Sequence, residues 1–322
     1  MKKAQFNDIV EQVPELNHKQ RLQLRKEIEH CSDLKQVCDL LESRIENNPH
    51  CPHCQSNNFI KHGFRNNLTR YRCKSCSKTF NALTGTPLAN LRKKELWTSY
   101  AQCLLDSKTL RKTAKSIKIA LSTSFKWRHR FMAIAQENET QILSGIVEAD
   151  ETFFLKSQKG NKHLNRPPRK RGGKAKQRGL SKELISVLVA CDRSGHEADY
   201  ITGSGPLSCL WLQENFKQHL DDQVIFITDS AKSFAAFSRR QEIEHITINL
   251  SQGQKKKGIY HIQNVNAYHS ILKNWIKRFH GIATKYLDHY LGWCNELYTR
   301  KLSDPLELIK LAFELKTPTT GT

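Results

Sequence analysis

Two aspartates at the ends of hydrophobic segments, far apart in the chain, are candidates for binding metal ions. Asp150 lies in the segment 146–154, and Asp229 ends the segment 224–229. Both segments have the composition of buried strands, so the carboxylates should project at the edge or end of a sheet. On neighbouring strands they can hold one or two Mg²⁺ ions, which activate a water or a 3′-hydroxyl in phosphodiester chemistry. Taken alone, each aspartate also fits a cap or turn at a strand end.

Two glutamates flank Asp150 and are possible substitutes for a missing carboxylate. They are Glu148 and Glu151. We expect strand alternation to point both of them to the side opposite Asp150, so that neither is a ready replacement.

Two pairs of cysteines have the spacing of a zinc site. Cys51 and Cys54 form one pair, Cys73 and Cys76 the other, with 18 residues between the pairs. The two-residue gap lets both thiolates of a pair reach one ion, and two pairs complete a closed tetrahedral site, so the zinc would be structural. A unit this small folds only with its metal. The alternative is two chance pairs of buried thiols.

The charge of the chain favours a polyanionic partner. Lys and Arg number 52 against 31 Asp and Glu, a formal net charge of +21 over 322 residues. Cationic side chains that neutralise phosphates release counterions from nucleic acid, whereas the alternative is a solvated surface without a partner. The segment 156–182 holds 11 Lys and Arg and no Asp or Glu. It is either an unstructured charge run or an element that folds onto DNA through residues such as Lys170 and Arg171.

The segment 109–131 is typical of a helix-turn-helix, with two short helices and a tight break. The apolar residues expected on the inner face are Ala114, Ile117, Leu121, Phe125 and Phe131. Ser122 is expected to cap the second helix. The residues left to face DNA are Thr123, Lys126, Arg128 and Arg130. The alternative is a helical linker with a charged face.

The elements that must position these groups follow an α/β order. Strands are expected at 143–154, 183–192, 196–203, 224–229 and 243–250, with a helix at 206–220 and helices from residue 264 onwards. The predicted domains are an N-terminal helical segment (1–47), a zinc ribbon (48–84), a helix-turn-helix region (90–136), a catalytic domain (143–300) and a C-terminal tail (301–322).

Together these features resemble the DDE transposases of bacterial insertion sequences, in particular the group with an N-terminal zinc ribbon. The matching parts are the two cysteine pairs, the segments Val147–Thr152 and Thr228–Ser230, and the later block with His261, Asn266 and Lys273. The resemblance covers about residues 48–300. It implies an RNase H-like catalytic core, a mixed sheet with flanking helices, that depends on Mg²⁺. Asp150 and Asp229 would be the first two carboxylates of the family.

The third position departs from the family pattern. The family places a Glu on a helix with Lys or Arg seven residues later, and here Lys273 follows Asn266 by seven residues. Asn offers Mg²⁺ a carbonyl oxygen without a charge. His269 shares the same helix face and is a ligand or proton carrier, although Mg²⁺ prefers oxygen. Lys273 would contact the DNA backbone. The site either uses Asn266, recruits His269, or is inactive; we favour the first two together.

These observations predict a transposase that binds the ends of an insertion sequence and catalyses Mg²⁺-dependent DNA cleavage and strand transfer. Its partners would be double-stranded DNA and further copies of the chain, because two DNA ends must be brought together. The alternatives are a non-catalytic, zinc-containing DNA-binding regulator and a related RNase H-like nuclease that cuts without joining. No apolar run is long enough to span a bilayer, and no apolar stretch follows the first lysines as in a secretory signal, so we predict a cytoplasmic, nucleoid-associated protein.

Overall fold

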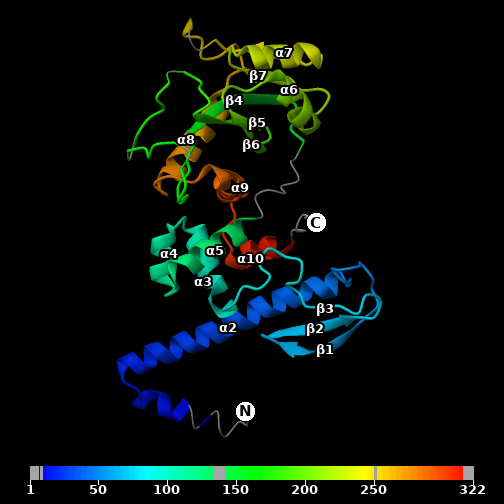
Figure 1. The fold of residues 1–322 in the computed structure, drawn as a ribbon, viewed down its shortest axis with the longest axis vertical. Helices are drawn as coiled ribbons and strands as arrows, with labels where there is room; N and C mark the ends of the chain where they lie inside the picture. Colours follow the sequence, from blue (N-terminus) through cyan, green and yellow to red (C-terminus); the bar gives the residue numbers. More distant parts are fainter. Residues whose placement is uncertain are drawn as a thin grey trace. The chain divides into compact units, whose positions relative to one another are not determined.

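The computed structural model describes residues 7, 10–133, 142–164, 166–170, 172–177, 179–249 and 252–314. The chain divides into two compact units (Figure 1). The N-terminal unit comprises residues 1–131 and 303–322, and the sheet unit comprises residues 132–302. Within the described part of the chain, no helix is both long enough and apolar enough to cross a membrane.

The N-terminal unit begins with a long helix. After a short 3-10 turn, η1 (Val13–Glu15), helix α2 (His18–Asn47) starts at a capping box in which Asn17 and Gln20 bond to each other's backbone amides. Only the C-terminal half of α2 buries apolar side chains, namely Val37, Leu41 and Ile45. This half therefore packs on the rest of the unit.

The zinc-ribbon segment forms a small antiparallel sheet of strands β1 (Phe59–Arg65), β2 (Leu68–Cys73) and β3 (Thr79–Phe80), in that order. Phe59 packs edge-on against Tyr71 and Phe80, with ring centroids 5.4 and 5.2 Å apart. The backbone N–H of Thr69 donates to Glu42 of α2 at 2.6 Å. The hairpin is thus held to α2 by apolar and polar contacts.

The remaining helices of this unit are η2 (Lys94–Leu96), α3 (Trp97–Leu105), α4 (Leu110–Ser116), α5 (Leu121–Phe131) and α10 (Pro305–Glu314). Helix α10, from the segment predicted as a tail, packs against α3, α2 and α5. The two short helices predicted in segment 109–131 are present as α4 and α5.

The inner face predicted for α5 is wrong in two of its residues. Leu121 is 46% and Phe125 41% exposed, whereas Ser124, Trp127, Arg128 and Phe131 are buried. Trp127 and Phe131 pack against Tyr100 of α3, with centroids 5.2 and 5.3 Å from its ring. The tertiary partner thus selects the Trp127 side. Ser122 is the second residue of α5 rather than its cap.

The sheet unit contains a five-stranded mixed sheet in the order β6-β5-β4-β7-β8. Its strands are β4 (Ile146–Leu155), β5 (Leu184–Asp192), β6 (Glu197–Ser204), β7 (Ile225–Thr228) and β8 (Glu244–Thr247). The pairs β4–β5 and β5–β6 are antiparallel, whereas β4–β7 and β7–β8 are parallel. Three antiparallel strands extended by two parallel ones form an RNase H-like sheet, so the predicted fold class is confirmed.

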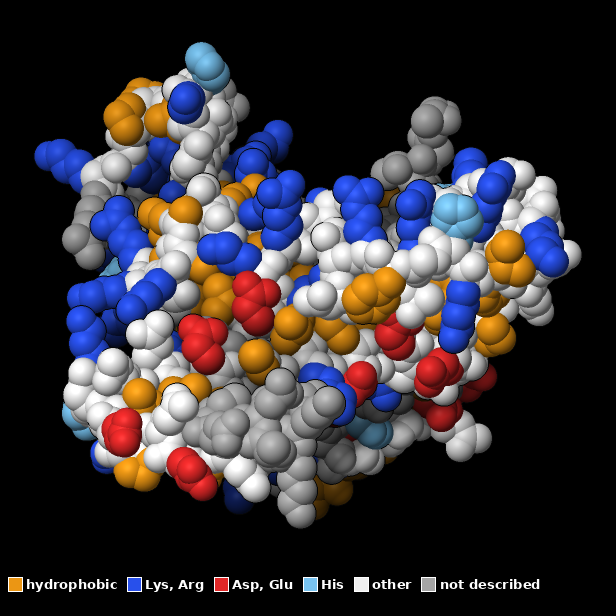
Figure 2. Space-filling view, turned by 90° about the horizontal axis from the view of Figure 1, so that it is seen from below, with side chains coloured by type: hydrophobic (Ala, Val, Ile, Leu, Met, Phe, Trp, Pro, Cys, Tyr) orange, Lys and Arg blue, Asp and Glu red, His pale blue; other side chains and the backbone are white. Residues whose placement is uncertain are grey.

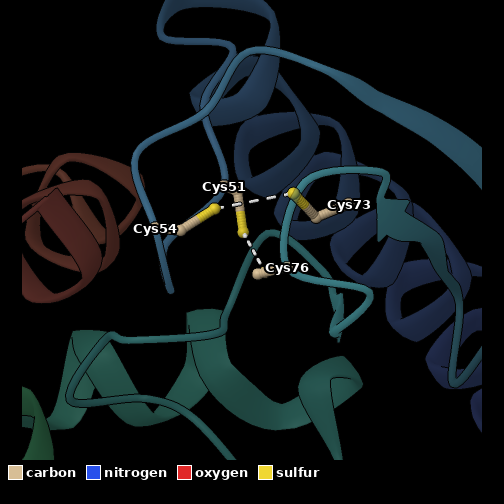
Figure 3. Close-up of side chains that lie close together, drawn as sticks. All are labelled: Cys51, Cys54, Cys73 and Cys76. Carbon is tan, nitrogen blue, oxygen red and sulfur yellow. Dashed lines mark hydrogen bonds between the residues drawn. The ribbon is translucent and has the colours of Figure 1, made fainter.

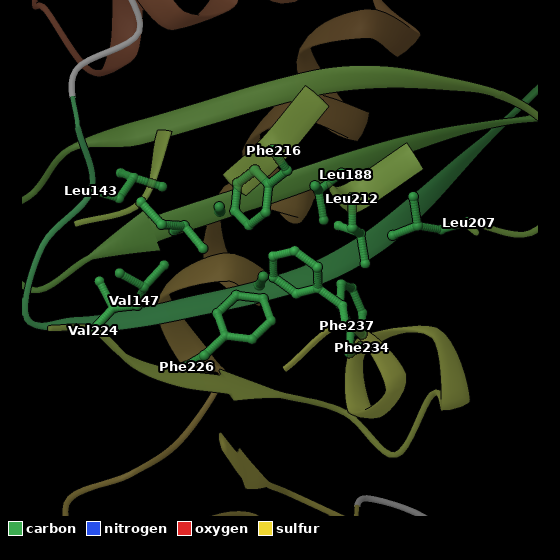
Figure 4. Close-up of a cluster of buried hydrophobic side chains, with 13 residues drawn as sticks. Leu143, Val147, Leu188, Leu207, Leu212, Phe216, Val224, Phe226, Phe234 and Phe237 are labelled. Atoms are coloured by element: carbon green, nitrogen blue, oxygen red, sulfur yellow. The ribbon is translucent and has the colours of Figure 1, made fainter. Parts of the chain in front are cut away.

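Helices cover both faces of this sheet (Figure 1). One face packs on α6 (Cys209–Trp211), η4 (Leu212–Phe216), η5 (Lys217–His219) and α7 (Lys232–Arg240). Its core includes Val147, Phe216, Phe226, Phe234 and Phe237 (Figure 4). The other face carries α8 (Gln263–Lys277), which is followed by η7 (Thr284–Tyr286) and α9 (Leu287–Tyr298). Helix α7 is not among the elements predicted from the sequence.

Candidate metal site and nucleic-acid interface

The register of β4 and β7 brings Asp150 and Asp229 to one place. The two parallel strands pair from Ile146–Ile225 to Ala149–Thr228, so the aspartates are the next residue on each strand. Residues 148 and 227 of the same register lie on the face that carries α8, and by alternation Asp150 and Asp229 follow them. Strand β7 ends at Thr228, whereas β4 continues. The side chain of Asp229 therefore stands at the end of its strand beside Asp150.

The electrostatics of Asp150 agree with this placement. Burial, and next the carboxylate of Asp229, raise the pKa of Asp150 to about 6, although the N–H of Glu151 donates to it at 2.8 Å. The positive charge of Lys273 lowers the pKa of Asp150. Two carboxylates that repel each other in a partly buried place, with oxygen ligands only, form a donor set that suits a divalent cation.

Helix α8 brings its polar side to these carboxylates. The Nδ1 atom of His269 lies 3.9 Å from Oδ2 of Asp150. His269 is 6% exposed, and burial together with the charge of Lys273 lowers its pKa to about 4, so the imidazole is neutral at pH 7. Lys273 and Asn266 are exposed on the same side of the helix. The structure thus gathers Asp150, Asp229, His269 and Lys273, with Asn266 one turn before His269.

The orientation predicted for Glu148 is wrong. Residues two apart on a strand share a face, so Glu148 lies on the side of Asp150 and contacts α8. Its carboxylate is fully buried and accepts hydrogen bonds from Asn264 at 2.9 Å. Glu151 points to the other face, as predicted, and accepts from Ser186 Oγ at 2.6 Å and from the N–H of Leu207 at 3.0 Å. Both glutamates are therefore already engaged.

The four cysteines of the zinc ribbon converge on one point (Figure 3). The Sγ atoms of Cys51, Cys54, Cys73 and Cys76 all lie within 4.8 Å of one another. The Cys51–Cys76 and Cys54–Cys73 pairs are 3.7 and 3.6 Å apart. Tetrahedral zinc with Zn–S bonds of about 2.3 Å requires sulfurs about 3.8 Å apart. The residues therefore fit a Cys₄ zinc site.

The candidate DNA-binding residues of α5 differ in exposure. Lys126 is exposed on α5. Arg130 is exposed as well, and its Nη1 donates to the carbonyl of Pro87 at 3.0 Å. The surface position predicted for Arg128 is wrong, because its side chain is 1% exposed and donates to the carbonyl of Lys108 at 2.6 Å. Arg128 thus links α5 to the turn before α4.

The basic segment 156–182 is anchored where the structure describes it. The ammonium of Lys159 donates to the carbonyls of Gly281 and His280, just after α8, at 2.7 and 3.1 Å. Arg169 pairs with Glu183 at 3.0 Å. Lys170 is exposed, whereas Arg171 lies outside the described residues. Figure 2 shows Lys and Arg side chains spread over much of one face of the molecule, in keeping with the net charge of +21.

Comparisons with known proteins find similarity to transposases. Residues 142–295 match the ISXO2-like transposase domain. A Halobacterium salinarum protein described as an uncharacterized protein in transposable element ISH50 is 23% identical over 256 residues, which cover 78% of this chain and 86% of that protein. Two solved Mos1 complexes are also similar, a pre-cleavage transpososome at 14% identity and a strand transfer complex at 15%. Each match covers 67% of this chain, and the matches cover 77% and 76% of the Mos1 chains. The TM-score of 0.23 is too low to support any conclusion. Residues 142–295 are therefore similar to the ISXO2-like transposase domain, and the chain is similar over most of its length to a protein of a transposable element.

Proposed function

We propose that this protein is an active transposase that binds the ends of an insertion sequence and catalyses Mg²⁺-dependent DNA cleavage and strand transfer. The observation that carries the proposal is the pairing of β4 with β7, which sets Asp150 and Asp229 side by side on the α8 face of an RNase H-like sheet. The mutual repulsion of their carboxylates is what a bound divalent cation relieves.

In this proposal each residue has a distinct role. Asp150 and Asp229 hold the metal, and the amide oxygen of Asn266 completes the ligand set in place of a third carboxylate. Neutral His269, whose Nδ1 lies 3.9 Å from Oδ2 of Asp150, serves as a further ligand or as a proton carrier. Lys273, exposed on the same side of α8, binds a phosphate of the DNA. Bound Mg²⁺ would supply Lewis-acid activation of the attacking oxygen and stabilisation of the leaving oxygen.

The other domains would bind and hold DNA. We assign residues 48–84 to a structural zinc ribbon, 90–136 to a helix-turn-helix region and 143–300 to the catalytic domain. Lys126 and Arg130 of α5, and Lys170 of the basic segment, are exposed cations suited to phosphate contacts. Because two ends of an element must be joined together, we expect a homodimer or larger assembly on DNA.

A strand-transfer assay tests this function. Labelled duplexes carrying the terminal sequences that flank the gene are incubated with Mg²⁺ and the natural chain, Asp150→Asn or Asp229→Asn. We expect nicked and joined products from the natural chain and losses of about a thousandfold or more in either variant, since each removes a metal ligand. Equal behaviour of all three proteins would favour a DNA-binding regulator. Nicked but unjoined DNA would favour a nuclease.

A further inference from the structure

Helix α8 has no capping side chain at its N-cap position, although the N–H of its first residue, Gln263, donates to Nδ1 of His261 at 3.2 Å. The N-cap residue is Ile262, whose side chain accepts no hydrogen bond, although the first amides of a helix need acceptors. Here Oε2 of Glu148 accepts from the backbone N–H of Asn264 at 2.9 Å and from that of Val265 at 3.5 Å. These are the second and third residues of α8, the amides that an N-cap side chain normally binds. A strand residue far away in the sequence thus caps this helix.

The second carboxylate oxygen of Glu148, Oε1, binds two further side chains near the start of α8. Oε1 accepts from Nδ2 of Asn264 at 2.9 Å and pairs with Nη2 of Arg193 at 3.0 Å. Arg193, in the turn between β5 and β6, also donates to the carbonyl of Ile259, just before α8, at 3.3 Å. Glu148 is 0% exposed. Its charge also complements the positive end of the α8 dipole. Because a buried, paired charge is costly to disturb, this contact is a rigid one.

The contacts of Glu148 with the first turn of α8 and with Arg193, here called the anchor, have a functional consequence. Glu148 and Asp150 are two residues apart on one face of β4, and Asn266 directly follows the residues that Glu148 caps. We propose that Glu148 is a positioning residue that fixes the first turn of α8 against β4 and so sets Asn266 and His269 opposite Asp150 and Asp229. This proposal rests on the proposed function, in which those side chains form the metal site.

The geometry also distinguishes Glu148 from a metal ligand. Both of its oxygens are engaged by α8 and Arg193, so a cation would have to displace those donors. Displacement of reacting groups by about 1 Å is enough to lower a rate by about a hundredfold. Weakening the anchor should therefore displace α8 and lower the rate of catalysis.

Hydrogen exchange of the zinc-loaded protein, measured without added Mg²⁺, tests the anchor directly. Glu148→Gln keeps the shape of the side chain, but it removes the charge and turns one acceptor into a donor. We expect the amides of residues 263–266 to exchange about tenfold faster or more. Glu151→Gln is the matched control, because Glu151 is a partly buried glutamate of the same strand that binds the N–H of Leu207 on the other face. It should speed exchange near Leu207 and leave residues 263–266 as they are.

The second readout is the Mg²⁺ dependence of strand cleavage, compared between the two variants. Glu148→Gln should slow cleavage about tenfold or more relative to Glu151→Gln and raise the Mg²⁺ concentration for half-maximal rate. If Glu148→Gln does not fold, Asn264→Ala, which changes an exposed residue, replaces it in both measurements. Unchanged exchange at 263–266, or cleavage equal to that of Glu151→Gln, overturns the proposal. Cleavage by Asp150→Asn at the natural rate would instead refute the proposed function, and the exchange result would still decide whether the anchor exists.

Discussion

The burial of Arg128 predicts that its replacement damages the fold rather than a DNA contact. The guanidinium is 1% exposed and donates to the carbonyl of Lys108 at 2.6 Å. Arg128→Met replaces the aliphatic part of the side chain with an apolar one but removes the guanidinium and its charge-assisted hydrogen bond, which contributes about 1.5–3 kcal/mol. For a unit of about 150 residues this corresponds to a fall in Tm of about 3–12 °C.

The assay compares Arg128→Met with Lys126→Met by thermal unfolding and by DNA binding at several salt concentrations. Lys126 is exposed on the same helix, so its replacement should leave Tm within about 1 °C and weaken DNA binding, with a salt slope smaller by about one. A normal Tm for Arg128→Met, together with a DNA-binding defect like that of Lys126→Met, would refute the reasoning. It would mean that Arg128 reaches the surface in solution.

Three further predictions concern other parts of the chain. Cys76→Ser should remove one bound zinc per chain, measured by atomic absorption, and unfold the ribbon, since three thiolates hold zinc poorly; retained zinc would contradict the Cys₄ site. Burial raises the pKa of Asp199 to about 6 despite a hydrogen bond from Tyr268 at 2.6 Å, so the folded chain binds this proton more tightly than the unfolded chain. The contribution of Asp199 to the free energy of unfolding should therefore fall as pH rises from about 4 to 6, and urea unfolding of Asp199→Asn should not show that fall. Identical pH profiles of the two proteins would contradict the argument. Lys159→Met should free the start of the basic segment from the end of α8 and speed its cleavage by trypsin, whereas exposed Lys162→Met should not, and equal rates would show that the anchor is absent.

The sequence reveals most where chemistry requires a fixed spacing. The cysteine pairs can be found because zinc demands two residues between the members of each pair, and the four Sγ atoms do converge. The strands around Asp150 and Asp229 are rich in β-branched and aromatic residues, and this pattern can be recognised without knowledge of the fold. The parallel pairing of β4 with β7, which brings the two aspartates together, follows from the order of elements only once the fold is known.

Tertiary partners decide what the sequence left open. Helix α5 carries two apolar stripes, one with Leu121 and Phe125 and one with Trp127 and Phe131, and the ring of Tyr100 selects the second. The error over Glu148 has a simpler origin, since the two-residue period itself places it beside Asp150. No local pattern predicts the cap that it gives to α8, because the acceptor for the amides of Asn264 and Val265 lies on a strand more than 100 residues earlier in the sequence.

The three acids of β4 also explain why the charge of the proposed metal site rests on two residues. Glu148 is bound by α8 and Arg193, and Glu151 by Ser186 and the N–H of Leu207. Each of these contacts holds a different element to the strand. Asp150 instead is largely buried and faces a second carboxylate, and burial together with that carboxylate raises its pKa. Strand β4 thus uses Glu148 and Glu151 to hold the elements on its two faces, and it leaves Asp150, between them, beside a second carboxylate, where a cation is a suitable partner.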